Sequence, residues 1–152
     1  MIRKISLGVM MLFVGAEAGA IQAKCAGCSI GKEKLQCDYY VERKGDLSRQ
    51  KTCLAYAKHV DIDGAYPKAA WYYLLAGEFA KAEASARKAL TQGQAYGGEY
   101  LAISLWAQGK EKAARKVLNR FLREVPRHDY LGKDLKTMEM LYPKKRIREL
   151  VK

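Results

Sequence analysis

The residues of this 152-residue chain best suited to chemistry are four cysteines, Cys25, Cys28, Cys37 and Cys53. An even number of cysteines in an exported protein indicates disulfides before it indicates a metal site. Cys37 lies eight residues before Gly45, and Cys53 lies eight residues after it. Residues equidistant from the turn of an antiparallel helical hairpin face each other, so we expect a Cys37–Cys53 disulfide.

Cys25 and Cys28 form a C-x-x-C pair, a spacing that occurs in redox dithiols, zinc sites and haem attachment sites. Haem attachment is excluded because Ser29 stands where a histidine is required. The gaps to Cys37 and Cys53 differ from those of paired zinc-binding units, and a thioredoxin-like dithiol needs a preceding strand. We favour a small N-terminal disulfide loop or a tether to the first hairpin. A redox pair, and pairing of Cys25 or Cys28 with Cys53, remain alternatives.

No other residues form a recognisable catalytic group. The two histidines, His59 and His128, are isolated in the sequence, and His59 falls near the end of a predicted helix. The nucleophile elbow, the H-E-x-x-H zinc motif and the phosphate-binding glycine loop are absent from the sequence. The sequence therefore predicts neither an enzyme, nor a metal site, nor a cofactor.

The first twenty residues have the features of a signal peptide. Arg3 and Lys4 precede an apolar run, 5–14, and the small residues Ala18-Gly19-Ala20 follow it. The run is too short to span a bilayer comfortably. We expect cleavage after Ala20 and a periplasmic or secreted protein; an uncleaved N-terminal anchor is the alternative. The expected mature chain begins with a cysteine-containing segment, 21–32.

The composition is strongly basic, with a formal net charge of +12. An exported protein does not meet nucleic acid in its ordinary course, so we do not expect nucleic-acid binding despite this charge. It does meet anionic lipids and acidic partners, and attraction to an anionic envelope surface is a reasonable expectation. The positive charge is densest in a C-terminal basic patch: Lys144, Lys145, Arg146 and Arg148.

Apolar residues recur at helical spacing, and Gly45, Gly77 and Gly109 stand 32 residues apart between amphipathic stretches. Each glycine is expected to form the turn of a helical hairpin. Pro67 suits the first turn of its helix, and Pro126 ends another. The expected helices are 33–44, 46–60, 66–76, 78–91, 96–108, 110–124, 131–142 and a short one from 143 to 151.

Alanines flank the second and third glycines at matching positions, where they let two helices approach closely. With these residues the chain resembles the tetratricopeptide-repeat family: Ala70, Tyr73, Gly77, Phe79, Ala82 and Ala89, then Leu101, Ala102, Leu105, Gly109, Ala114 and Pro126. The first hairpin departs from the pattern, because Asp38 and Gln50 occupy positions that are small in the others. An alanine-rich helical bundle is the alternative.

The resemblance implies an all-α fold in which about three hairpins, 33–126, form a short right-handed solenoid and 127–152 forms capping helices. In that family the first helices of successive hairpins line a concave groove. The resemblance thus implies a scaffold or adapter, monomeric or weakly oligomeric, that binds a protein or peptide partner. The implied partner-binding residues are Tyr39, Lys68, Trp71, Leu74, Tyr96, Ile103 and Trp106, with Arg43 as a further charge. The alternative expectation is that Trp71 and Trp106 belong to the core or lie beneath the C-terminal cap.

Overall fold

A computed structural model of the chain describes residues 26–152, which are largely helical and contain no strand. No helix within this range is long and apolar enough to cross a membrane. The expectations for the signal peptide and for Cys25 fall on residues outside the described range. The α-helices are α1 (Ala26–Gln36), α2 (Gln50–Ile62), α3 (Tyr66–Leu75), α4 (Phe79–Thr91), α5 (Gly97–Ala107), α6 (Glu111–Glu124) and α7 (Leu131–Leu141).

The first helix begins at Ala26, before the expected start at Glu33, and Cys28 lies within it. The helix continues directly into a π-helical segment, η1 (Cys37–Arg43). The chain then turns at Gly45, whose φ of 71° favours glycine. A single 3-10 turn, η2 (Leu47–Arg49), leads into α2, and the carboxylate of Asp46 caps it by accepting from the backbone N–H of Ser48 at 3.0 Å.

The predicted disulfide between Cys37 and Cys53 is confirmed. It joins η1 to α2 across the first turn, with the two Cα atoms 4.9 Å apart and both residues fully buried. In a chain-entropy description, closing a loop of this size stabilises the fold by about 3 kcal/mol. The bridge therefore fixes the hairpin whose sequence departs most from the others.

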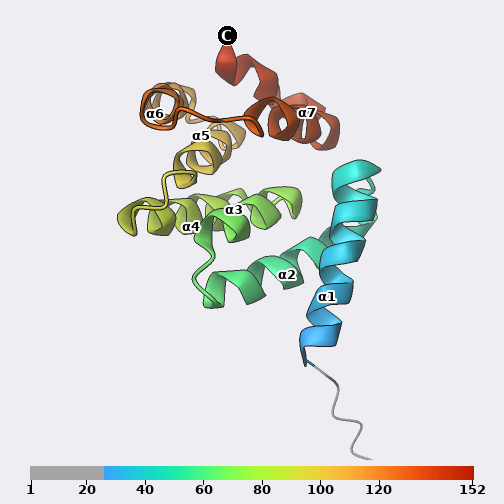
Figure 1. Ribbon diagram of the computed structural model, residues 1–152. Coiled ribbons are helices and arrows are strands. Elements are labelled where there is room, and N and C mark those ends of the chain that lie inside the picture. The colour runs from blue at the N-terminus through green and yellow to red at the C-terminus, as the bar shows by residue number, and fades with distance from the viewer. Residues whose placement is uncertain (1–25) are drawn as a thin grey trace, which may run out of the picture.

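The next two hairpins turn where the sequence indicated. Gly77 and Gly109 have φ values of 76° and 78° and close the α3–α4 and α5–α6 turns. Each helix from α2 to α6 packs against the next in sequence, and α3 also contacts α5. Figure 1 shows these helices stacked in order from α2 to α6, with α3 and α5 on successive levels. Short glycine turns thus fold each second helix back onto its first helix.

The buried small residues show how the second helices of the hairpins correspond. Ala82 and Ala86 of α4 precede Ala114 and Leu118 of α6 by 32 residues, and all four are buried. In α2, however, the matching buried pair is Cys53 and Ala57, only 29 residues before the α4 pair. The expectation that Gln50 occupies this position is wrong. The 3-10 turn η2 lengthens the connection after Gly45 and shifts the register.

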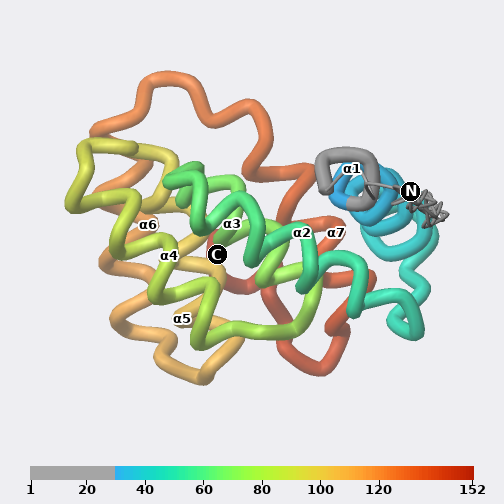
Figure 2. The backbone as a smooth tube through the Cα atoms, turned by 90° about the horizontal axis from the view of Figure 1, so that it is seen from below, coloured from blue at the N-terminus to red at the C-terminus, as the bar shows by residue number. Residues whose placement is uncertain are grey.

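The C-terminal residues return to the first helices instead of extending the stack. Figure 2 shows the segment 125–130 carrying the chain from α6 across to α7. Helix α7 contacts α3 and η1, and two 3-10 turns follow it, η3 (Pro143–Lys145) and η4 (Ile147–Val151). Turn η4 packs against α5 and α6, burying Ile147 and Leu150. The cap therefore touches all three hairpins.

The close packing of α4 against α5 at Gly97 gives a prediction about stability. A Cβ atom added at Gly97 meets the Ala89 Cβ at 2.7 Å and the Ala86 carbonyl oxygen at 2.8 Å, so α4 and α5 have to separate. We expect Gly97→Ala to reduce the free energy of unfolding by about 1–3 kcal/mol in urea denaturation. Gly132→Ala is the matched control, because nothing lies within 4 Å of its added Cβ. That helical substitution is expected to be neutral or stabilising by up to about 1 kcal/mol. Equal stabilities of the two variants contradict the prediction.

Candidate functional site

The expected aromatic groove is not an open surface. Trp71 and Trp106 are only 8% and 5% exposed, and Leu74 and Ile103 are fully buried. The prediction that these four side chains line an accessible groove is therefore wrong. They belong to the core, which was the alternative considered for the two tryptophans. The returning C-terminal segment supplies part of this cover, over Trp106 and the end of α3.

Trp106 is held beneath that segment by polar as well as apolar contacts. Its indole N–H donates to the carbonyl oxygen of Lys145 at 2.9 Å. The guanidinium of Arg115 stacks over the indole, 5.0 Å from the ring centroid, and also reaches the Leu150 carbonyl oxygen at 3.4 Å. Buried indoles pair their N–H whenever they can. The C-terminal turns thus supply both the cover and the acceptor that Trp106 needs.

Tyr142, in the same C-terminal segment, covers the end of α3 and bonds its last carbonyl groups. Its hydroxyl lies 3.0 Å from the carbonyl oxygens of both Leu74 and Leu75, to which it donates, and it accepts from Gln50 Nε2 at 2.6 Å. Gln50 also donates to Leu75 at 2.9 Å. The last carbonyls of a helix lack partners within that helix. The hydroxyl and the amide therefore pair the end of α3 and tie the cap to α2.

The remaining members of the predicted groove are exposed but separated from one another. Tyr39 lies on η1 beside Tyr40, with ring centroids 5.0 Å apart, and the ammonium of Lys44 lies over its ring. Tyr96 precedes α5 and donates to the Arg127 carbonyl oxygen at 3.0 Å. Lys68 is exposed on α3. The structure does not bring these three side chains together into one site.

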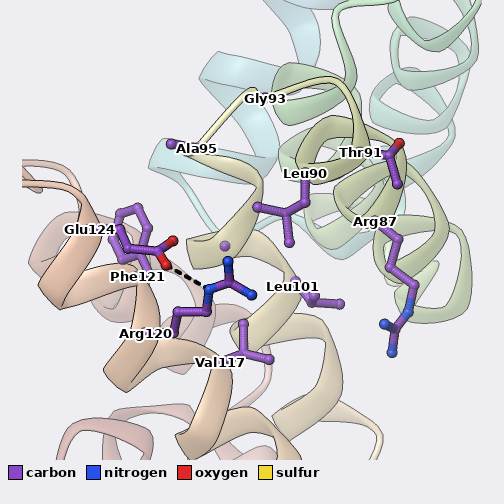
Figure 3. Close-up of a pocket in the computed structure, with 11 residues that line it drawn as sticks. Arg87, Leu90, Thr91, Gly93, Ala95, Leu101, Val117, Arg120, Phe121 and Glu124 are labelled. Carbon is purple, nitrogen blue, oxygen red and sulfur yellow. Dashed lines mark hydrogen bonds and ion pairs between the residues drawn. The ribbon is translucent and has the colours of Figure 1, made fainter.

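An open pocket of about 590 Å³ lies elsewhere, between α4 and α6 with α5 as its floor. Figure 3 shows its apolar residues Leu90, Leu101 and Val117 between two arginines, Arg87 and Arg120, with Phe121 on the far side of Arg120 beside Glu124. The other lining residues are small or polar: Thr91, Gly93, Ala95, Gly98 and Glu124. We name this feature the α4–α6 pocket. None of the binding residues predicted from the sequence lines this pocket.

Small residues around the α4–α5 connection make room for this pocket. Gly93 has a φ of 73°, and nothing lies within 4 Å of an added Cβ there. At Gly98 an added Cβ comes within 3.1 Å of the Phe121 Cβ. Together with Ala95 these glycines leave the upper part of the pocket without side chains. A run of small residues beside two arginine-bearing helices was the available sequence signal.

The two arginines of the pocket are in different electrostatic settings. Arg87 pairs with Glu83 at 2.8 Å, and Lys110 and Gln108 approach the same carboxylate at 2.9 and 2.8 Å. Burial opposes ionisation of Glu83, but the hydrogen bonds from Lys110, Arg87 and Gln108 outweigh it and lower its pKa to about 2. Arg120 pairs through Nε with Glu124 of its own helix at 2.7 Å, and both side chains are largely exposed. Arg87 is thus part of a network, whereas Arg120 is held by one solvated partner.

A pair of acidic residues is enclosed where α5 meets α7. Glu99 is fully buried and neither of its carboxylate oxygens has a hydrogen-bond partner of good geometry, although Asp134 of α7 lies near enough to influence it. Burial first, and then the Asp134 carboxyl group, raises the pKa of Glu99 to about 8. Burial likewise raises the pKa of Asp134. Tyr100, Lys133 and Glu42 are the other titratable groups that act on Asp134.

Lys144, Lys145, Arg146 and Arg148 are all exposed on the C-terminal turns, and Arg146 pairs with Glu149. No grouping of histidine, cysteine and acidic residues suited to a metal ion occurs within the described range. The redox hypothesis for Cys25 and Cys28 stays a prediction, since Cys25 lies outside that range.

Comparison with known proteins adds no further identification. No protein-family model, curated protein or solved structure matches this chain. Its function therefore has to be argued from its own geometry.

The buried carboxyl pair gives a prediction on pH dependence. The raised pKa of Glu99 means that the unfolded chain releases this proton at lower pH than the folded one, so stability falls as pH rises from about 4 to about 8. We expect Glu99→Gln to flatten this fall and to be the more stable protein at pH 8, by about 3 kcal/mol in urea denaturation. Glu111→Gln, at an exposed position, is the control and should retain the wild-type slope. A wild-type slope in Glu99→Gln contradicts the assignment.

Proposed function

We propose that the protein is an exported, non-enzymatic helical adapter that binds a segment of a partner protein in the α4–α6 pocket. In this proposal the hairpins are tetratricopeptide-like repeats forming a short solenoid, with α7, η3 and η4 as its cap. Support comes from the glycine turns, the small residues at helix contacts and the Cys37–Cys53 bridge. The concave face, however, is occupied by the chain itself.

The observation that carries the proposal is the exposed apolar surface at the α4–α6 pocket. Leu90 is 38% exposed on its rim, Val117 is partly buried, and Leu101 and Phe121 form the buried floor. Pockets of this size between helices are common binding sites for the apolar side chains of partners. Charged side chains at the edge supply the polar rim that protein interfaces usually have. The pocket thus combines an apolar centre with a charged border.

Leu90→Gln tests this assignment. It removes apolar contact area at the rim without adding charge, so we expect capture of the partner to weaken by roughly fivefold, equivalent to ~1 kcal/mol. Ile62→Gln is the matched control: Ile62 is 85% exposed at the end of α2 and does not line the pocket. Proteins captured from envelope extracts by each purified, tagged variant are quantified by mass spectrometry.

The two substitutions separate the pocket from nonspecific adhesion. The proposal requires proteins whose recovery falls with Leu90→Gln and is unchanged with Ile62→Gln, while both variants retain the wild-type helical circular dichroism. Recovery that falls equally in both variants, or in neither, assigns capture to another surface and refutes the proposal.

A second candidate function is docking on an anionic envelope surface through the basic patch. It is favoured by the exposure of all four cationic side chains on consecutive short turns. Each basic residue near an anionic membrane contributes about 1 kcal/mol, and salt screens the attraction.

Vesicle sedimentation tests this second candidate. The protein should sediment with phosphatidylglycerol-containing vesicles at low salt and be released at high salt. The combined variant Lys144→Gln, Lys145→Gln and Arg148→Gln should lose this binding. Replacing Lys112, Lys116 and Arg123 of α6 by glutamine removes the same charge elsewhere and should leave it. Binding that ignores both salt and the C-terminal variant rejects this candidate.

A further inference from the structure

The second helices of successive hairpins are neighbours in two places, α2 beside α4 and α4 beside α6. The α4–α6 pocket lies at the second of these, where the residues differ from those at the first. Aligning the buried pairs Cys53–Ala57, Ala82–Ala86 and Ala114–Leu118 sets the correspondence between α2, α4 and α6. With that alignment the α2–α4 contact can be compared residue by residue with the α4–α6 contact. Three positions matter: Asp61 corresponds to Leu90, Ser85 to Val117 and Lys88 to Arg120.

In the first contact a carboxylate joins the two helices. Asp61 of α2 accepts from the Ser85 hydroxyl of α4 at 2.7 Å and pairs with the Lys88 ammonium at 3.7 Å. Gln94 reaches back to the Gly64 carbonyl oxygen at 3.4 Å beside them. The space between α2 and α4 is therefore bridged by polar groups of the chain itself. A cation at the position of Lys88 has its counter-ion on the neighbouring helix.

Between α4 and α6 the corresponding positions hold a cation, Arg120, but no carboxylate. Leu90 stands at the position of Asp61, and Val117 replaces the hydroxyl of Ser85. Arg120 bonds Glu124 of its own helix through Nε, and within residues 26–152 no carboxylate of α4 pairs with its terminal guanidinium nitrogens. Figure 3 shows those nitrogens directed to the centre of the pocket, toward Leu90 and Leu101. The α4–α6 pocket thus presents a cation without the cross-helix anion that the α2–α4 contact contains.

We infer that the partner segment supplies this anion: an aspartate or glutamate side chain bonds the terminal nitrogens of Arg120, and an adjacent apolar side chain covers Leu90, Val117 and Phe121. This inference rests on the proposed function and specifies the chemistry of its ligand. Arginine binds carboxylate with two parallel hydrogen bonds, which are among the stronger polar contacts in proteins.

The charges around the pocket favour a single carboxylate over a multiply charged ligand. Arg87 is committed to Glu83, and Glu124 places a negative charge on the same rim as Arg120. One guanidinium therefore remains to receive an anion, which suits a single carboxylate better than a ligand with several negative charges. The open, apolar-floored shape suits a peptide lying across the helices, with one acidic and one apolar side chain pointing inward.

The inference is tested with three capped peptides of alternating leucine and a second residue, which is glutamate, glutamine or lysine. Each is titrated into the full isotope-labelled protein while the methyl signals of Leu90, Leu101 and Val117 are followed by NMR. We expect the glutamate peptide to shift these methyls with a Kd at least about fivefold below that of the glutamine peptide, and the lysine peptide to bind weakest. High salt should reduce the difference.

Three variants assign the preference to one residue. Arg120→Gln should equalise the glutamate and glutamine peptides. Leu90→Asp restores the carboxylate found at Asp61, so it should pair with Arg120 and also abolish the preference. Arg123→Gln removes a positive charge from the same helix outside the pocket and should keep it. Circular dichroism confirms that each variant is folded.

The outcomes separate the inference from the proposed function. Equal shifts of the pocket methyls by all three peptides overturn the acidic specificity and leave the adapter proposal standing. A preference that survives Arg120→Gln also overturns the inference. No methyl shift with any peptide refutes the pocket as a peptide site, and the proposed function with it. Hexanoate binding as tightly as the glutamate peptide reassigns the pocket to small amphiphiles and overturns the inference.

Discussion

The return of the C-terminal segment across the first helices of the hairpins is the constraint on which the rest of this structure depends. Helices α3 and α5 carry large apolar side chains all around, so one neighbouring helix cannot bury them. Tyr142 pairs the last carbonyls of α3, and the Lys145 carbonyl accepts from Trp106. With these bonds the cap covers the face on which the sequence predicted a groove. In the proposed function, binding uses the α4–α6 pocket instead, which lies over α5.

Most of the helical framework could be predicted because local chemistry determines it. The turns at Gly77 and Gly109 need positive φ, and helix α6 ends at Glu124, just before Val125 and Pro126, as expected. The disulfide followed from the symmetry of two cysteines about Gly45. The first hairpin was less predictable, because a π-helical segment and an added 3-10 turn alter its register. Neither has a sequence signature as strong as a glycine turn, so the sequence pattern places Gln50 at the position that Cys53 holds in the structure.

The prediction of an open aromatic groove is wrong for a reason that lies in long-range packing. Whether Trp106 is exposed depends on where the backbone of Lys145 lies, 39 residues further along the chain. Helical periodicity carries no information about such a contact. One signal was available: α5 is apolar on every side, and such a helix is buried on every side. Read in that way, the sequence would have argued against an open aromatic groove and for a covering element supplied by residues after Pro126.

The comparison of Asp61 with Leu90 shows why polar groups bridge the space between α2 and α4, whereas the space between α4 and α6 is an open pocket. Replacing a carboxylate and a hydroxyl by leucine and valine removes two cross-helix bonds that the chain makes elsewhere, yet the basic residue is retained. The exposed ion pair of Arg120 with Glu124 contributes little to stability, so stability alone does not account for an arginine at this position. The carboxylate that we infer on the partner gives this arginine a role in binding. The same logic separates folding from binding: core residues such as Ala86 and Leu118 hold the helices together, while Leu90 and Arg120 remain accessible to a partner.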